Sequence, residues 1–151
     1  MKKASKLSPS RTHCRIAVSS KKRAIEKAAE LIASSDSRLE ESALYSQLIA
    51  REKLSPTGLG KGIAIPHCRM PGCNTIIGSL ITLNTPIEFD AIDNEPVSTL
   101  FVLIVPENET VVHLEVLSML VQNFEKPSFQ SKILAASDSE SLYLAAVSDS
   151  L

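Results

Sequence analysis

The chain has 151 residues, of which 44% are hydrophobic and 22% are charged, and its formal net charge is −1 at pH 7. This length suits one globular domain, and the composition excludes an intrinsically disordered chain. No apolar run approaches the roughly 18 residues that a transmembrane helix needs, and the 3 scattered cysteines do not indicate a disulfide framework. We therefore expect a soluble, cytoplasmic protein without membrane insertion.

The charge is unevenly distributed along the chain. Residues 1–27 hold nine of the 16 basic residues and one of the 17 acidic ones, so this head carries +8 and the remainder −9. A basic head can indicate a nucleic-acid-binding arm or a transit peptide. However, no nucleic-acid motif accompanies it, and only 4% of the residues are aromatic. We expect no nucleic-acid partner, and we assign residues 1–12 to a loose basic tail and 13–151 to the folded domain.

Hydrophobic periodicity predicts the elements of this domain. In chain order they are a strand over 13–18, helices over 21–34 and 38–53, strands over 75–83 and 98–105, and helices over 109–124, 127–134 and 138–147. Ser19 or Ser20 can cap the first helix, and Ser137 to Glu140 form a capping-box pattern before the last one. The strand over 98–105 is apolar on both faces, which is typical of a central strand. The predicted fold class is α/β (mixed α+β): a mixed, mostly parallel sheet with helices on both faces.

A glycine cluster between the second helix and the next apolar segment contains Gly58, Gly60, Lys61 and Gly62. It lacks the spacing of a phosphate-binding P-loop, and it follows a helix instead of a strand, unlike a dinucleotide-binding fingerprint. The pattern therefore predicts a tight turn with positive φ angles. A remaining alternative is that backbone N–H groups of the turn form an anion-binding nest beside a reactive side chain.

Histidines are the candidates for chemistry. His67 directly follows Pro66, so its ring is presented by a stiff backbone. From spacing alone it is either a nucleophile or general base, or a surface-loop histidine bonded to backbone. His113 near the start of an apolar helix is by itself typical of a core or boundary residue, and Arg51 at a helix C-terminus suits the helix dipole. The histidines and cysteines lack metal-ligand spacing, so we expect no metal site.

The run from Gly60 to His67, GKGIAIPH, resembles a signature of the IIA components of the phosphoenolpyruvate-dependent phosphotransferase system, in their fructose/mannitol class. Within that class the chain is most similar to the nitrogen-regulatory branch. The resemblance covers about residues 20–147. Its supporting stretches are residues 20–24, 51–54, 89–93 with Pro96-Val97, and 105–107 leading to His113-Leu114. A local departure is Cys68, where many relatives have Gly.

The resemblance implies a type-2 IIA fold and a phosphotransfer role. It implies that His67 accepts a phosphoryl group from an HPr-type phosphocarrier protein, that His113 is its hydrogen-bonding partner, and that Arg51 stabilises the phosphoryl charge. It implies no cofactor. The output would be phosphorylation-dependent binding to regulatory target proteins. Two alternatives stay open: a sugar-specific IIA that passes phosphate to a IIB domain, and a binding module that is never phosphorylated.

Overall fold

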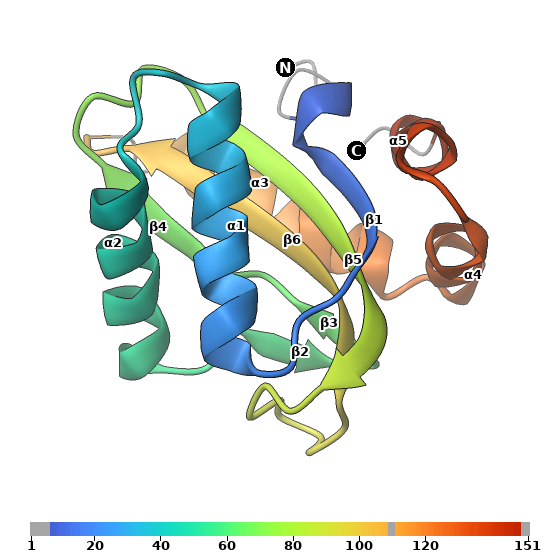
Figure 1. Cartoon of the computed structure of the whole chain (residues 1–151). Helices are drawn as coiled ribbons and strands as arrows, with labels where there is room; N and C mark the ends of the chain where they lie inside the picture. The colour runs from blue at the N-terminus through green and yellow to red at the C-terminus, as the bar shows by residue number, and fades with distance from the viewer. Residues whose placement is uncertain (1–6, 109–110, 149–151) are drawn as a thin grey trace.

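A mixed β-sheet forms the centre of the molecule (Figure 1). The computed structural model describes residues 7–108 and 111–148, and for residues 111–113 it describes the backbone alone. The strands are β1 (Thr12–Ile16), β2 (Gly58–Gly60), β3 (Ile63–Ala64), β4 (His67–Met70), β5 (Ile77–Ile87) and β6 (Val97–Pro106). Their order is β1-β5-β6-β3-β2, and β4 also pairs with β6. The pairs β1–β5, β3–β6 and β4–β6 are parallel, whereas β5–β6 and β2–β3 are antiparallel, as the predicted mixed sheet requires.

Helices cover both faces of this sheet. The helices α1 (Lys21–Ser35) and α2 (Glu41–Leu54) pack on one face, and α3 (Val111–Phe124), α4 (Pro127–Ala135) and α5 (Ser139–Val147) pack on the other (Figure 1). Successive side chains of β6 alternate between the two cores: Leu100 and Val102 face α1 and α2, whereas Phe101 and Leu103 face the other helices. The predicted central strand, buried on both faces, is therefore confirmed.

The helix ends follow local capping chemistry. Ser20 is the N-cap of α1, and its Oγ accepts a hydrogen bond of 3.2 Å from the amide of Arg23, as the sequence predicts. The box before α5 is shifted by one residue from the prediction: Asp138 is the N-cap and Ser141 the reciprocal partner. An aspartate carboxylate accepts from an amide as well as a serine does, so the pattern fits either register.

The N-terminal boundary of the folded part lies before residue 13. The Leu7 side chain is 2% exposed, and the guanidinium of Arg11 donates a hydrogen bond of 3.0 Å to the carbonyl of Gly78 in β5. Residues 7–12, which the sequence analysis assigns to the tail, thus contact the domain. Residues 1–6 lie outside the described part of the chain.

The strand that accompanies β6 is broken in the middle. Ile63 in β3 pairs with Thr99, and His67 in β4 pairs with Leu103, so β3 and β4 run end to end along β6. Ile65 and Pro66 separate them, and Pro66 accepts a hydrogen bond of 2.9 Å from the amide of Leu103. Because proline has no N–H to donate to a neighbouring strand, it interrupts the hydrogen-bond ladder. The next strand, β4, therefore begins at His67.

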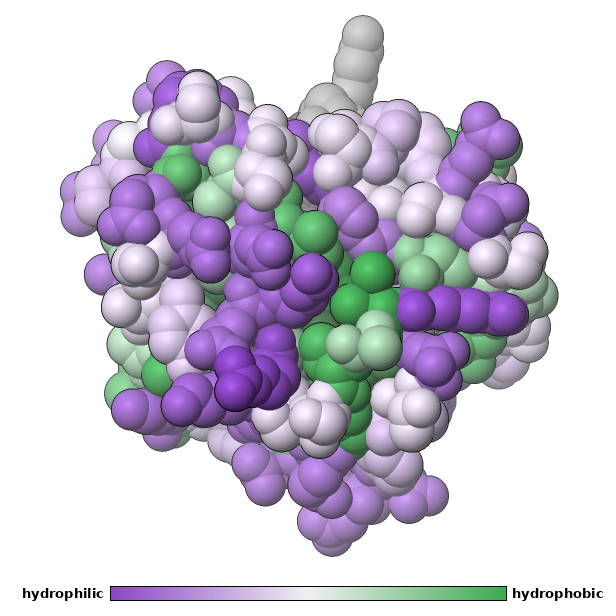
Figure 2. Space-filling view, viewed as in Figure 1, coloured by the Kyte–Doolittle hydropathy of each residue, from purple (hydrophilic) through white to green (hydrophobic). Residues whose placement is uncertain are grey.

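Polar side chains dominate the outer surface over α1 and α2, with apolar side chains gathered in a hollow near the middle of that face (Figure 2). In the described ranges, no helix is both long and apolar enough to cross a membrane.

Candidate functional site

The ring of His67 is held in one orientation by the backbone of Ile65, two residues earlier in the chain. Its Nδ1 lies 2.8 Å from the carbonyl oxygen of Ile65. A carbonyl oxygen can only accept, so Nδ1 carries the hydrogen of the neutral ring and the lone pair is on Nε2. The geometry thus indicates which nitrogen is nucleophilic, a point on which the sequence is silent.

The surroundings favour the neutral form of this ring. Burial lowers the pKa of His67 from its usual value, and the positive charge of Arg51 lowers it further. The hydrogen bond to Ile65 and the negative charge of Glu52 act in the opposite direction but do not outweigh burial. A neutral imidazole is the form that attacks an electrophile.

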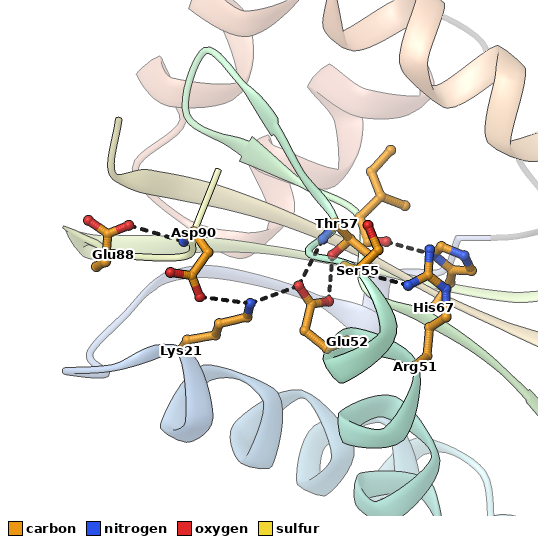
Figure 3. A network of polar contacts seen from close by, with 9 residues as sticks. Lys21, Arg51, Glu52, Ser55, Thr57, His67, Glu88 and Asp90 are labelled. Carbon is orange, nitrogen blue, oxygen red and sulfur yellow. Dashed lines mark hydrogen bonds and ion pairs between the residues drawn. The ribbon is translucent and has the colours of Figure 1, made fainter. Parts of the chain in front are cut away.

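Arg51 lies in the last turn of α2, and its side chain extends to the same region as the His67 ring (Figure 3). Its Nη1 donates a hydrogen bond of 2.9 Å to the carbonyl of Ser55, the C-cap residue of the helix. The guanidinium therefore stabilises the helix end, as the sequence suggests, and places a positive charge near His67. Arg51 and His67 are thus brought together from two elements.

Glu52 is a site residue that the sequence analysis did not single out. It is 5% exposed, and its carboxylate accepts hydrogen bonds from both the amide and the hydroxyl of Thr57, at 2.8 and 2.7 Å. Lys21 from α1 forms an ion pair with it at 3.0 Å and a second one with Asp90 at 3.4 Å (Figure 3). This network joins α1, α2 and the loop after β5.

The glycine turn adopts the predicted backbone but lies away from His67. Gly60, Lys61 and Gly62 have φ angles of 95°, 57° and 80°. The carbonyl of Gly62 accepts from Ser98 and Thr99, near the start of β6, whereas His67 pairs with Leu103. At about 3.3 Å per residue, the turn is roughly 15 Å along β6 from His67. The amide of Lys61 moreover donates to Asp93 at 2.9 Å. Gly58, in β2, lies against Ala91.

His113 belongs to the first turn of α3, but its side chain lies outside the described part of the structure. Cys68 is buried in the core between the sheet and α1–α2, and burial raises the pKa of its thiol to about 12. It is therefore a poor nucleophile. Among the residues that the structure describes, no group of three or more His, Cys, Asp or Glu could hold a metal ion.

A groove of about 820 Å³ lies elsewhere on the surface, along α1 and the start of α2. Its lining includes Arg23, Glu30 and Tyr45 but neither His67 nor Arg51. This groove is therefore separate from the candidate site.

Residues 6–146 match the family model described as "Phosphoenolpyruvate-dependent sugar phosphotransferase system, EIIA 2". The chain belongs to this family. Proteins of this IIA family are phosphotransfer components, so the family named from the sequence is confirmed.

Relatives place the chain near the nitrogen-regulatory branch of the family. It is 40% identical over 137 residues to the "Nitrogen regulatory protein" of Pseudomonas aeruginosa, covering 91% of this chain and 89% of that protein. Among solved structures, it matches nitrogen regulatory protein IIA-Ntr from Neisseria meningitidis with a TM-score of 0.84 and 39% identity, over 94% of this chain and 97% of that one.

A more distant match is Escherichia coli IIAMTL, solved in complex with phosphorylated IIBMTL. It has a TM-score of 0.70 and 18% identity, and the match covers 89% of this chain and 92% of that one. This likeness shows the fold alone, and together these structures confirm the predicted type-2 IIA fold.

Proposed function

We propose that this chain accepts a phosphoryl group on Nε2 of His67 from the phosphohistidine of an HPr-type phosphocarrier protein. The observation that carries the proposal is the hydrogen bond from Nδ1 to the carbonyl of Ile65, which leaves the ring lone pair on Nε2. The lowered pKa of His67, due mainly to burial, keeps that lone pair available near neutral pH.

The transfer exchanges one nitrogen–phosphorus bond for another. A bond forms between Nε2 of His67 and the phosphorus while the bond to the carrier's imidazole breaks, and the electron pair of the broken bond returns to the carrier's ring. The carrier's phosphoimidazole reacts with a proton on its other ring nitrogen, so its ring leaves as a neutral imidazole, and the product ring of His67 keeps its Nδ1 hydrogen. Proton and charge thus balance on the two rings, and the step needs no general base. What the acceptor supplies is therefore position and charge stabilisation.

Arg51 is proposed to stabilise the phosphoryl charge. A phosphorylated side chain carries roughly two negative charges near neutral pH, and a guanidinium binds phosphate oxygens in a fork-like geometry. The support for this role is that the positive charge of Arg51 lies close enough to lower the pKa of His67. His113 is proposed as a hydrogen-bonding partner on the resemblance alone. The turn containing Gly58, Gly60 and Gly62 is not part of the proposal, because Gly60 and Gly62 lie far along β6 and the Lys61 amide is engaged by Asp93.

The test reconstitutes the reaction with the general phosphotransferase enzyme, its HPr-type carrier and labelled phosphoenolpyruvate. We expect acid-labile, base-stable label on the wild type and on the control His13→Ala, and none on His67→Ala. His113→Ala is expected to slow the transfer while the protein stays folded. Label retained by His67→Ala would exclude His67 as acceptor, and an unlabelled wild type would favour the non-phosphorylated binding module.

The loop between β5 and β6 is suited to meet a basic carrier. Its side chains Glu88, Asp90, Asp93 and Glu95 are exposed, and Ile92 is 83% exposed among them. Opposite charges on two partners speed their encounter and are screened by salt. We expect transfer to slow as the salt concentration rises, whereas a salt-independent rate would exclude this docking surface.

The output is proposed to be regulatory: the protein binds regulatory target proteins according to its phosphorylation state. The support is its similarity to proteins named nitrogen regulatory proteins at about 40% identity. A pull-down that compares the phosphorylated and unphosphorylated forms tests this. The alternative, transfer to a IIB domain, is supported only by the fold-level likeness to IIAMTL. Rapid loss of label to a IIB domain would favour it.

A further inference from the structure

Glu52 is a buried carboxylate that the transfer step does not use. It follows Leu44 and Leu48 at four-residue spacing, on the face of α2 that packs into the core. An apolar side chain would fill such a position at least as well, because desolvating a carboxylate can offset the gain from its ion pair. Packing alone therefore does not explain the acid.

The carboxylate instead anchors the loop that follows α2. Its two oxygens accept from the amide and the hydroxyl of Thr57, and Lys21 balances its charge at 3.0 Å. Thr57 is itself only 6% exposed, so water has little access to compete for its two hydrogen bonds to Glu52. Hydrogen bonds to a charged acceptor are about twice as strong as neutral ones.

This anchored loop reaches both proposed site residues. The carbonyl of Ser55 accepts from the guanidinium of Arg51 at 2.9 Å. The carbonyl of Thr57 accepts from the amide of Ile65 at 3.1 Å, and the carbonyl of Ile65 accepts from Nδ1 of His67 at 2.8 Å. Two short chains of hydrogen bonds thus run from one loop to the charge-stabilising residue and to the nucleophile (Figure 3).

We propose that Glu52 is a positioning residue that fixes Arg51 and His67 relative to each other by anchoring residues 55–57. The proposal rests on the proposed function of His67 as phosphoryl acceptor. Without the carboxylate, the loop loses both hydrogen bonds of Thr57, and Lys21 loses its buried ion-pair partner. The loop that carries the Ser55 carbonyl and bonds Ile65 is then free to shift. Near-attack geometry is sensitive to shifts of about 1 Å, so the transfer rate follows the position of this loop.

The kinetic test is a double-mutant cycle on phosphoryl transfer from the carrier. We expect Glu52→Ala to lower kcat/KM about tenfold, equivalent to ~1.4 kcal/mol, mainly through kcat, because the exposed docking residues are unchanged. Arg51→Ala is expected to lower it more. In the double variant, the loss of kcat/KM is expected to be smaller than the product of the two single losses, because Glu52 acts partly by placing Arg51. A merely structural role would give independent, multiplicative effects.

The matched control is Asp36→Ala. Asp36 also accepts a hydrogen bond from a backbone amide, that of Arg38 at 3.0 Å, and it forms an ion pair with the guanidinium of Arg38. It lies at the C-terminal end of α1, whereas Lys21, the partner of Glu52, lies at the N-terminal end. This variant is expected to keep the wild-type transfer rate. Glu52→Gln, which preserves shape and can still bond Thr57, is expected to recover most of the rate.

A second measurement does not depend on phosphorylation. Hydrogen exchange at the Ile65 amide is expected to be at least tenfold faster in Glu52→Ala and unchanged in Asp36→Ala. An unlabelled wild type with faster Ile65 exchange in Glu52→Ala would overturn the acceptor role but not the anchoring. If Glu52→Ala does not fold, Thr57→Val decides: it removes only the hydroxyl contact and is expected to lower kcat severalfold. Unchanged rate and exchange in the folded variant, or multiplicative effects in the cycle, would overturn the proposal.

Discussion

Replacing Gly58 by alanine tests how closely the β2–β3 hairpin and the loop after β5 are packed. A Cβ at this position would lie 2.8 Å from Cα of Ala91 and 2.9 Å from its Cβ, well inside the 3.4–4 Å of ordinary contact. The nearer atom belongs to the backbone, so no rotamer change relieves the clash. Overpacking of this kind costs about 1–3 kcal/mol. For a chain of this length we expect a fall in Tm of about 2–4 °C per kcal/mol.

The assay is urea unfolding of Gly58→Ala, of Ala91→Gly and of the double variant. Ala91→Gly removes the 2.9 Å contact but leaves the 2.8 Å one, so it should recover only part of the loss. Gly72→Ala is the comparison: its Cβ would make only an ordinary contact, 3.7 Å from the carbonyl oxygen of Arg38, but its φ of +85° strains an alanine. If Gly58→Ala were as stable as the wild type, the close approach of the two segments would be refuted.

Three further predictions concern charge, pH and thiols. Arg51→Ala should lower the transfer rate at least tenfold (~1.4 kcal/mol) with unchanged circular dichroism, and Arg51→Lys should be intermediate, whereas a normal rate in Arg51→Ala would remove it from the site. Burial lowers the pKa of both His13 and His67 in the folded protein. In the unfolded chain these histidines have a pKa of about 6.5, so below that pH the unfolded state binds more protons than the folded state. The free energy of unfolding should therefore fall as the pH drops below about 6.5. His13→Leu should flatten this fall in urea unfolding at pH 8 and pH 5, and an unchanged slope would contradict the assignment. Under iodoacetamide, mass spectrometry should show Cys14, which is partly exposed, modified before the buried Cys68, whose pKa burial raises to about 12.

The long elements were predictable because their hydrophobic periods are strong. The predicted helix over 21–34 is observed as Lys21–Ser35, and the strand over 98–105 as Val97–Pro106. The strands β2, β3 and β4 were not predicted, since two to four residues cannot show a period. The strands β3 and β4 moreover pair with β6, more than thirty residues away, and local sequence carries no signal for that pairing.

The candidate site was predictable in part. The Pro66-His67 pair stands out in the sequence. The family resemblance implies that Arg51 lies near it, but residue patterns alone do not bring the two together, because their proximity depends on the packing of α2 beside β4. Proximity in sequence predicts an anion nest at Gly60 and Gly62 beside His67, but the extended segment of β3, Ile65 and Pro66 places the turn away from His67. The sequence does carry a signal for Glu52: it continues the apolar stripe of Leu44 and Leu48 with a charged residue, a pattern that indicates a buried carboxylate with a partner.

The break between β3 and β4 has a consequence for how another protein can engage this face. In the described sheet β4 pairs with β6 alone, so its other side is an edge beside the proposed acceptor. Exposed edges invite another chain to add a strand, which leads to aggregation or to permanent association. Here the edge is four residues long, is flanked by α2 and carries the exposed, charged Arg69. Such an edge disfavours β-augmentation, so a visiting partner would bind through side chains and could leave once the transfer is complete.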